Sequence, residues 1–317
     1  MTATATMETI YPIRAFEVAV AAVRQLSPHM LRVTFTGADL DYFGSNADGQ
    51  TLDLRIKVMV PSRGAPLPDF TALGEGWYQG WLAMDPDTRG YMRTYTVRSL
   101  RPGRPGIDGV PAVAAELDVD FVLHLDGGSG PAARWAAGAV PGDRLAIIGP
   151  DARAGVCLGI EFDPADATRL LLVGDETAVP AISAILESLP ASVSGHAVLE
   201  VPSAEDFLDL ATDSAVEITW LARGGHGHGE LLQDAVRKVL APAACHRGEE
   251  PEAVDVDATI LWETPEGVDT GSGFYAWIAG EAATVRELRR YLVRDAGVDR
   301  NAVAFMGYWR LGKAQPS

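Results

Sequence analysis

The sequence predicts a β plus α/β protein with two domains, a six-stranded antiparallel Greek-key β-barrel followed by a Rossmann-like parallel α/β domain. The length of 317 residues and a hydrophobic content of 47% are sufficient for two cores. From about residue 13 to residue 149, short β-rich runs alternate with Gly, Pro and Asp clusters, and no long helical period appears. From about residue 165, continuous apolar runs alternate with amphipathic segments, which is typical of parallel βα units. We therefore expect the domains at 10–160 and 165–317.

Six runs are the expected barrel strands, because each has a β-type pattern and ends at turn residues. They are 16–23, 30–36, 52–60, 91–97, 117–125 and 144–148. In the third run, alternate apolar residues share one face, which leaves Asp53, Arg55 and Lys57 on the other. A charged face of this kind is usually solvated.

The second domain is expected to contain strands at 169–173, 195–201, 217–221, 274–279 and 303–306, with helices at 181–189, 230–240 and 282–296. In the last helix, apolar residues recur every three or four positions, so Arg286, Arg289 and Arg290 are expected on its solvated side. Residues 242–257 are polar and acidic, and are interpreted as an excursion between elements. Ligands of open parallel sheets bind beyond the carboxyl ends of the strands, where 175–177, 280–281 and 307–309 are expected to converge.

Charge and cysteine usage restrict the partners and the compartment. The net charge is −17, from 43 acidic and 26 basic residues, so a nucleic acid is not expected as a partner. A small anionic ligand would need a locally basic pocket. The sequence has neither a leader pattern nor an apolar run long enough for a bilayer, so we expect a cytoplasmic protein without membrane insertion. Cys157 and Cys245 have no pair spacing and are expected to be reduced thiols.

The stretch 93–98 carries the clearest chemistry of the barrel half. As a strand it places Arg93 and Tyr95 on one face, and Thr96 and Arg98 on the other. An aromatic ring, a neighbouring hydroxyl and a guanidinium together suit a flavin dinucleotide. The alternative is an ordinary barrel strand with solvated arginines.

Two further segments carry weaker signals. The glycines of 127–130 precede Pro131, which can begin a short helix, and this arrangement favours phosphate without matching a known nucleotide motif. His124 precedes them and either contacts a ribose or pyrophosphate or is structural. His226 and His228 lie among glycines, and we favour a flexible loop over a metal site because no Cys or carboxylate ligand is adjacent in sequence.

Taken together, four motifs resemble those of the siderophore-interacting protein family, which are flavin-dependent ferric-siderophore reductases of the ferredoxin–NADP reductase superfamily. The motifs are Arg93-x-Tyr95-Thr96-x-Arg98, Gly174-Asp-Glu-Thr-Ala178, Ala279-Gly-Glu281 and Gly307-Tyr-Trp309. The resemblance extends over residues 13–313. Each motif is weak alone, and the combination is specific.

The resemblance implies FAD as cofactor, NADH or NADPH as electron donor and an anionic ferric siderophore as substrate. It implies a FAD site formed by Arg93, Tyr95, Thr96, Arg98, His124, Gly130, Ala132, Trp135, Thr177 and Trp309. Asp175, Glu176 and Thr177 would lie between flavin and nicotinamide as catalytic residues. The cations that would receive the siderophore are Lys57, Arg153 and Arg310. Two departures from the family pattern are Arg134 and the pair Asp151-Ala152, and the second weakens the assignment of Arg153.

This function has a chemical rationale. Nicotinamide gives up a hydride, Fe(III) accepts one electron, and a flavin can connect the two. Hard oxygen ligands hold Fe(II) more weakly than Fe(III), so reduction releases the metal without a protein ligand. The alternatives are a general NAD(P)H flavin or ferredoxin reductase and a siderophore-binding protein without enzymatic activity. The donor stays open among NADH, NADPH and a ferredoxin, and Arg223 is either a contact for a 2′-phosphate or a solvated loop residue.

Overall fold

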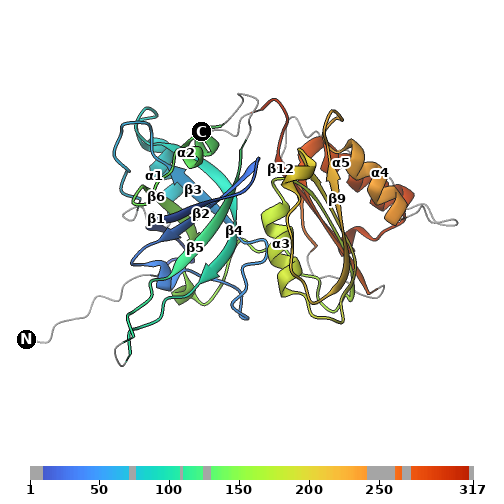
Figure 1. Cartoon of the computed structure of the whole chain (residues 1–317), viewed down its shortest axis with the longest axis horizontal. Helices are drawn as coiled ribbons and strands as arrows, with labels where there is room; N and C mark the ends of the chain where they lie inside the picture. Colours follow the sequence, from blue (N-terminus) through green and yellow to red (C-terminus); the bar gives the residue numbers. More distant parts are fainter. Residues whose placement is uncertain are drawn as a thin grey trace, which may run out of the picture. The chain divides into compact units, whose positions relative to one another are not determined.

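Six strands of the computed structural model close into a barrel with the order β1-β2-β5-β4-β3-β6 (Figure 1). The structure describes residues 10–70, 76–107, 110–123, 130–240, 261–265 and 273–313. The pairs β1–β6, β3–β4, β3–β6 and β4–β5 are antiparallel. The predicted antiparallel barrel is therefore confirmed. Its strands are β1 (Ile13–Ser27), β2 (Met30–Thr36), β3 (Arg55–Val60), β4 (Tyr91–Arg101), β5 (Glu116–Val122) and β6 (Arg144–Pro150).

The expected third strand is too long at its start. Leu52 has φ 48°, and the Leu54 amide donates to the Thr51 carbonyl at 2.7 Å, so this part of the chain is a turn and β3 begins at Arg55. The apolar alternation continues through the turn because Leu52 and Leu54 are both buried. Burial without strand geometry therefore produced the same pattern as a strand.

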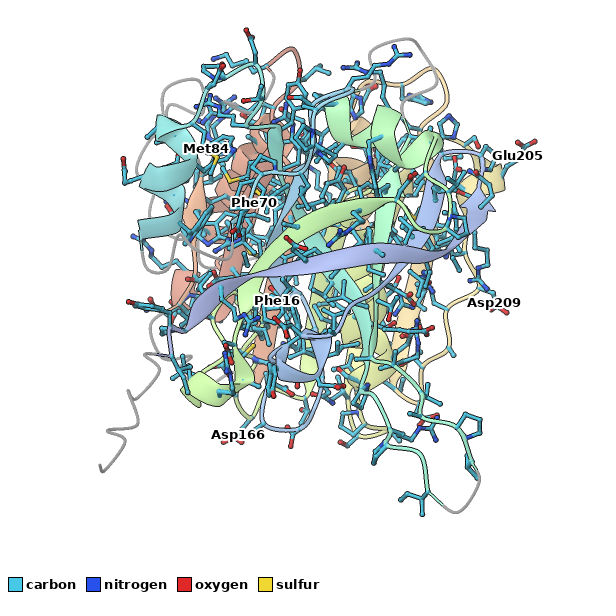
Figure 2. All side chains as sticks on the ribbon, turned by 90° about the vertical axis from the view of Figure 1, so that its left-hand side faces the viewer. Phe16, Phe70, Met84, Asp166, Glu205 and Asp209 are labelled. Carbon is cyan, nitrogen blue, oxygen red and sulfur yellow. The ribbon has the colours of Figure 1, made fainter. Side chains whose placement is uncertain are left out.

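A short helix that the sequence did not indicate, α1 (Trp77–Ala83), covers part of the barrel. Its Trp81 packs with Phe70, Met59 and Ile148 in one apolar cluster, and Met84 packs against the edge of the cluster. Figure 2 shows Phe70 and Met84 beside this helix. The indole nitrogen of Trp81 donates to the Arg89 carbonyl at 3.2 Å, which satisfies the polar end of a buried ring. A second short helix, α2 (Pro131–Ala137), follows β5.

The second sheet has the order β10-β12-β11-β7-β8-β9. Neighbouring strands are parallel, except that β10 runs antiparallel at one edge. This confirms the predicted parallel α/β sheet. The strands are β7 (Arg169–Asp175), β8 (Ser194–Val201), β9 (Ala215–Ala222), β10 (Trp262–Glu263), β11 (Phe274–Glu281) and β12 (Val303–Trp309). The helices are α3 (Val179–Ser188), α4 (Glu230–Val239) and α5 (Ala282–Arg290).

Helices cover both faces of this sheet, α3 on one side and α4 with α5 on the other (Figure 1). Burial on both faces explains the continuous apolar runs of β7 and β11, since neither strand has a solvated face. The last helix ends earlier than expected, at Arg290, and continues as a π-helical turn, Tyr291–Asp295. Single 3₁₀ turns are Leu40–Tyr42, Ala152–Ala154, Ala204–Asp206 and Arg300–Ala302.

Arg289 corrects one expectation for this helix. Its side chain is 4% exposed, and its guanidinium donates to both carboxylate oxygens of Glu263, at 2.9 and 2.8 Å. The expected solvated position is wrong because the edge strand β10, which the sequence did not indicate, brings a carboxylate to that side of the helix. A bidentate pair then satisfies the buried charge.

The chain divides into two compact units, and the tip of the β1–β2 hairpin, Arg24–Arg32, belongs to the second. The buried carboxylate of Asp206 holds this tip by accepting bonds from the Ser27 hydroxyl at 2.7 Å and from the His29 amide and ring at 3.0 and 2.8 Å. Burial acts to raise the pKa of Asp206, but these donors hold it below its ordinary value. Among the helices of the described residues, none has the length and apolarity needed to span a membrane.

Candidate functional site

The carboxyl end of β7 carries a buried carboxylate, Asp175, that ties three loops together. It accepts bonds from the Thr177 amide at 2.9 Å and the Thr177 hydroxyl at 2.5 Å on one oxygen. The other oxygen accepts from the Glu281 amide at 2.7 Å and the Trp309 indole at 2.8 Å. The expected convergence of 175–177, 280–281 and 307–309 at one sheet edge is therefore confirmed.

Two opposing effects act on the Asp175 carboxyl. Burial, followed by the negative charge of Glu176, raises the pKa of Asp175 to about 7. Hydrogen bonds from Thr177 and Trp309 act in the other direction, because donors favour the charged form. Gly280 allows the close approach that these bonds require, since it has φ 146° and a Cβ atom there would lie 2.6 Å from Asp175 Oδ2.

A second charged group lies at the ends of the neighbouring strands. Arg223, directly after β9, donates to both carboxylate oxygens of Glu176 at 2.9 and 2.8 Å, and to Glu200 at 3.3 Å. Arg223 and Glu176 are 8% and 3% exposed, and Glu200 is fully buried. Arg223 is therefore not a solvated loop residue. One oxygen of Glu200 has no hydrogen-bond partner among the described residues.

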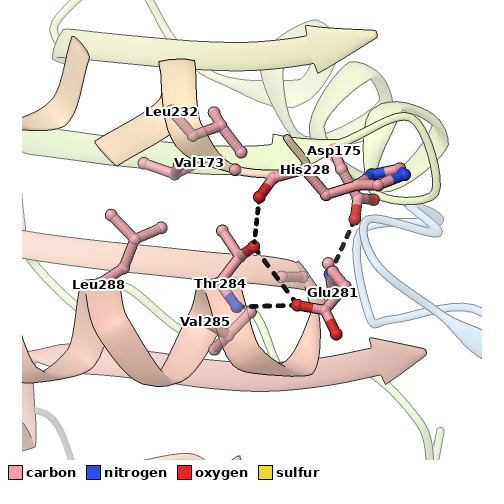
Figure 3. Close-up of a pocket in the computed structure, with 11 residues that line it drawn as sticks. Val173, Asp175, His228, Leu232, Glu281, Thr284, Val285 and Leu288 are labelled. Carbon is pink, nitrogen blue, oxygen red and sulfur yellow. Dashed lines mark hydrogen bonds between the residues drawn. The ribbon is translucent and has the colours of Figure 1, made fainter. Parts of the chain in front are cut away.

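A small pocket opens beside these charges, between β7, α4 and α5 (Figure 3). Polar groups of Asp175, His228, Glu281 and Thr284 line one part of it, and the remaining lining is mostly apolar and includes Leu232 and Leu288. Glu281 caps α5 by accepting from the Thr284 amide at 2.9 Å. In the part of the chain that is described, no three His, Cys, Asp and Glu side chains are grouped as metal ligands.

His228 lies in this pocket with an enclosed ring. Its Nδ1 atom is buried and has no partner within the described residues, and the ring meets Trp309 edge-on at 5.1 Å. Burial and the charge of Arg223 lower the pKa of His228, which favours the neutral ring. The loop interpretation of 226–228 therefore omitted a side chain that contributes to the pocket.

In the first unit, β4 carries the predicted flavin residues opposite β3. The register pairs Tyr95 with Ile56, Thr96 with Arg55 and Arg93 with Val58. Directly opposite residues share a face, so Arg93 and Tyr95 lie on one face and Thr96 on the other. Arg98 follows within β4, at a register shift between Val97 and Ser99. The alternation expected for Arg93 to Thr96 is confirmed.

Charge and burial are combined on these strands. Lys57 lies opposite Thr94, and its ammonium donates to the Thr94 hydroxyl at 2.7 Å. Burial and the neighbouring charge of Arg55 lower the pKa of Lys57. Burial likewise lowers the pKa of Arg93, which donates to the Met92 carbonyl at 2.7 Å, and burial raises the pKa of Tyr95. An anion that reached these cations would relieve their desolvation.

The remaining residues of the predicted FAD site, and the two cysteines, lie outside β4. Gly130 precedes α2, where Ala132 is buried and the Trp135 ring packs 6.1 Å from Phe121. His124 lies outside the described residues, as do Cys245 and the expected excursion at 242–257. Cys157 is a free thiol.

Two of the predicted substrate cations differ in their surroundings. Arg153 donates through Nε and a terminal nitrogen to Asp151, the shortest bond at 2.7 Å, and it stacks on the Tyr42 ring at 4.6 Å. Burial acts to raise the pKa of Asp151, but the bonds from Arg153 hold it below its ordinary value. Asp151 therefore already compensates the charge of Arg153. Arg310 follows β12 and is half-buried, and its carbonyl accepts from the Lys313 amide at 3.2 Å.

A closed antiparallel barrel followed by a parallel α/β sheet with polar loops at its carboxyl edge is a fold that ferredoxin reductases share. The ferredoxin reductase of carbazole 1,9a-dioxygenase has this fold, with a TM-score of 0.55 at 15% identity over 95% of this chain and 71% of that one. The sequence matches the family models "Siderophore-interacting FAD-binding domain" at residues 19–154 and "Siderophore-interacting protein" at residues 167–312. The chain belongs to the siderophore-interacting protein family.

Individual relatives agree with this assignment. The ferric vibriobactin reductase ViuB of Vibrio cholerae is 30% identical over 290 residues, which are 92% of this chain and 87% of that protein. The crystal structure of the siderophore-interacting protein SipS from Aeromonas hydrophila matches with a TM-score of 0.63 at 30% identity, over 95% of this chain and 93% of that one.

Proposed function

We propose that this protein is a flavin-dependent ferric-siderophore reductase, which reduces siderophore-bound Fe(III) to Fe(II) with electrons from NADH or NADPH and thereby releases iron in the cytoplasm. The observation that carries the proposal is the 30% identity to a ferric vibriobactin reductase across 92% of this chain. The match to a FAD-binding domain model at residues 19–154 supports the cofactor. The domains are proposed as 10–160 for FAD and 165–317 for the nicotinamide nucleotide.

The donor set on β4 fits FAD. Arg93 and Arg98 offer guanidinium groups for a diphosphate, Tyr95 offers a ring beside the isoalloxazine, and Thr96 a hydroxyl. Burial lowers the pKa of the half-buried Arg93, and a bound diphosphate would act in the opposite direction. Bound FAD would accept a hydride and pass on single electrons. The proposed site also includes His124, Gly130, Ala132, Trp135, Thr177 and Trp309.

The loop after β7 is proposed to orient the nicotinamide. The Thr177 hydroxyl is held by Asp175 at 2.5 Å, which leaves its oxygen able to accept a bond from a carboxamide. Asp175 fixes the loop against Glu281 and Trp309, whereas the Glu176 carboxylate is already paired with Arg223 and is not proposed to contact the nicotinamide. Held side chains of this kind orient a reactant without moving when it binds.

The anionic iron chelate is proposed to bind Lys57, Arg153 and Arg310. Lys57 is the strongest candidate, because burial and the charge of Arg55 lower its pKa and a bound anion would act in the opposite direction. Arg153 is the weakest, because Asp151 already compensates it. The iron needs no protein ligand in this proposal, since the siderophore supplies the oxygen ligands.

The test is an anaerobic titration of the purified protein with NADH and with NADPH, followed by a ferric siderophore and a chelator that colours on binding Fe(II). We expect one FAD per chain, bleaching by a nicotinamide and Fe(II) formation. A colourless protein that does not take up FAD would support a siderophore-binding protein instead. Equal rates with a ferric siderophore, free flavin and a dye would support a general flavin reductase.

A further inference from the structure

The carboxyl ends of β7, β8 and β9 lie in a strongly acidic part of the chain. From Leu170 to Ala222 the sequence contains nine Asp and Glu residues and no Lys or Arg. These residues include Asp175 and Glu176 after β7 and Glu200 near the end of β8. Any cation that serves a phosphate here must therefore come from outside this segment.

Arg223 is the first cation after the segment, and it is already neutralised. Its guanidinium makes two bonds to Glu176 and one to Glu200, and its side chain is 10% exposed. One positive and two negative charges give this trio a net charge of −1. Hydrogen bonds and charges from both partners raise the pKa of Arg223 against the effect of burial. The guanidinium is therefore engaged within the protein.

The position of this trio matters for a dinucleotide. In an open parallel sheet, the adenosine ribose lies beyond the carboxyl end of the second strand of the βαβ unit, where an acidic residue suits a 2′-hydroxyl and an arginine suits a 2′-phosphate. Here the first strand is β7, the crossover helix is α3 and the second strand is β8, which ends beside Glu200. Glu200 is fully buried, so it acts through its charge and through Arg223.

We infer that this edge of the sheet selects NADH against NADPH, because a 2′-phosphate would meet net negative charge and an arginine already held by two carboxylates. The inference rests on the proposed nicotinamide-driven function. Glu200 is a positioning residue for specificity. It holds Arg223 and the Gly229 amide, the latter at 3.0 Å, and its charge adds to the repulsion.

Binding and kinetics test the inference together. We expect calorimetry to show tighter binding of 5′-AMP than of 2′,5′-ADP, which differs by the 2′-phosphate. With the FAD-loaded protein, we expect kcat/KM for flavin reduction to be about tenfold higher with NADH than with NADPH. The NADPH value should rise with ionic strength, because salt screens a repulsion.

The experiments distinguish failure of the NADH preference from failure of the proposed function. Equal or better binding of 2′,5′-ADP, or equal or higher kcat/KM with NADPH, overturns the NADH preference while the nicotinamide function stands. If neither nucleotide bleaches the flavin, the proposed function fails, and the binding comparison still decides the charge argument. No binding of either adenosine probe overturns the placement of the ribose beside β8.

Glu200→Gln isolates the positioning residue. Removing one negative charge should raise kcat/KM for NADPH by about threefold to tenfold through KM, with kcat and FAD content unchanged. The matched control is Glu217→Gln on β9, where the carboxylate is 80% exposed and pairs with His196. An unchanged NADPH-to-NADH ratio in the first variant overturns the role of Glu200. If that variant does not fold, Glu200→Asp, which keeps the charge, should retain the parent's preference, and loss of the preference would overturn the charge argument.

Discussion

Asp175→Asn should change the pH dependence of stability more than stability itself. In the folded protein, burial raises the pKa of Asp175 to about 7, whereas the unfolded side chain has its ordinary value of about 3.9. The folded state therefore binds more protons than the unfolded state between these values. The contribution of the neutral carboxyl to stability is complete below pH 4 and is lost as the pH rises towards 7. The amide does not titrate, so the variant lacks this loss.

The magnitude follows from the shift. The pKa shift is about three units, and each unit corresponds to roughly 1.4 kcal/mol. The difference in free energy of unfolding between parent and variant should therefore change by on the order of 4 kcal/mol from pH 4 to pH 8. An offset that does not depend on pH is added to this change, because the NH₂ group of the amide cannot accept from the two donors on its side, whereas a neutral carboxyl keeps acceptor capacity on both oxygens. Between pH 4 and about pH 7 the variant should gain stability relative to the parent, and above pH 7 to 8 the difference should level off.

The assay is urea unfolding of both proteins at several pH values, with Asp166→Asn as a matched control on an exposed carboxylate (Figure 2). The difference in free energy of unfolding between the parent and Asp166→Asn should not change across the pH range. If the four donors outweighed burial, the parent would instead gain on Asp175→Asn as the pH rises. That sign, or a flat difference, would refute the dominance of burial at this site.

Three further predictions concern the proposed reaction. Arg93→Ala should weaken FAD retention by about 1.5–3 kcal/mol, the value of a charge-assisted bond, and unchanged retention on a desalting column would contradict its role. Thr177→Ala should slow flavin bleaching by a nicotinamide in stopped flow while FAD stays bound, whereas a parental rate would make the loop merely structural. Replacing both Lys57 and Arg310 with Glu should raise KM for a ferric siderophore and weaken the salt dependence of that KM, while flavin bleaching by a nicotinamide stays nearly intact. If Fe(II) formation depends on siderophore concentration in the same way in this variant and in the parent, the basic pocket is rejected.

The sequence predicted both sheets because their patterns are local. Burial alternates along the barrel strands because each has one solvated face. Burial is continuous in β7 and β11 because neither strand has a solvated face. The positions after β7 and β11 were also predictable, since parallel strands bring their carboxyl ends to one edge. Asp175 as the common acceptor of three loops was not, because the bonds from Glu281 and Trp309 span 106 and 134 residues.

Charged pairs were the least predictable part of the structure. Arg223 finds Glu176 and Glu200 at separations of 47 and 23 residues, and Arg289 finds Glu263 at 26. None of these spacings is a helical or cross-hairpin interval, so the strand order alone creates them. The one signal available was the absence of Lys and Arg from Leu170 to Ala222, which leaves Arg223 as the first cation after the strands that carry these buried carboxylates.

These pairs also limit how a protein with a net charge of −17 can bind an anion. An arginine held bidentately by a carboxylate contributes little field to a ligand, because the two charges nearly cancel beyond a few ångströms. A cation beside a hydroxyl or another cation keeps its field, as Lys57 does beside Thr94 and Arg55. For the proposed binding of a ferric chelate, the pairing of each cation therefore matters more than the number of cations, and on this argument Lys57 is a stronger candidate than Arg153 although both lie in the first unit.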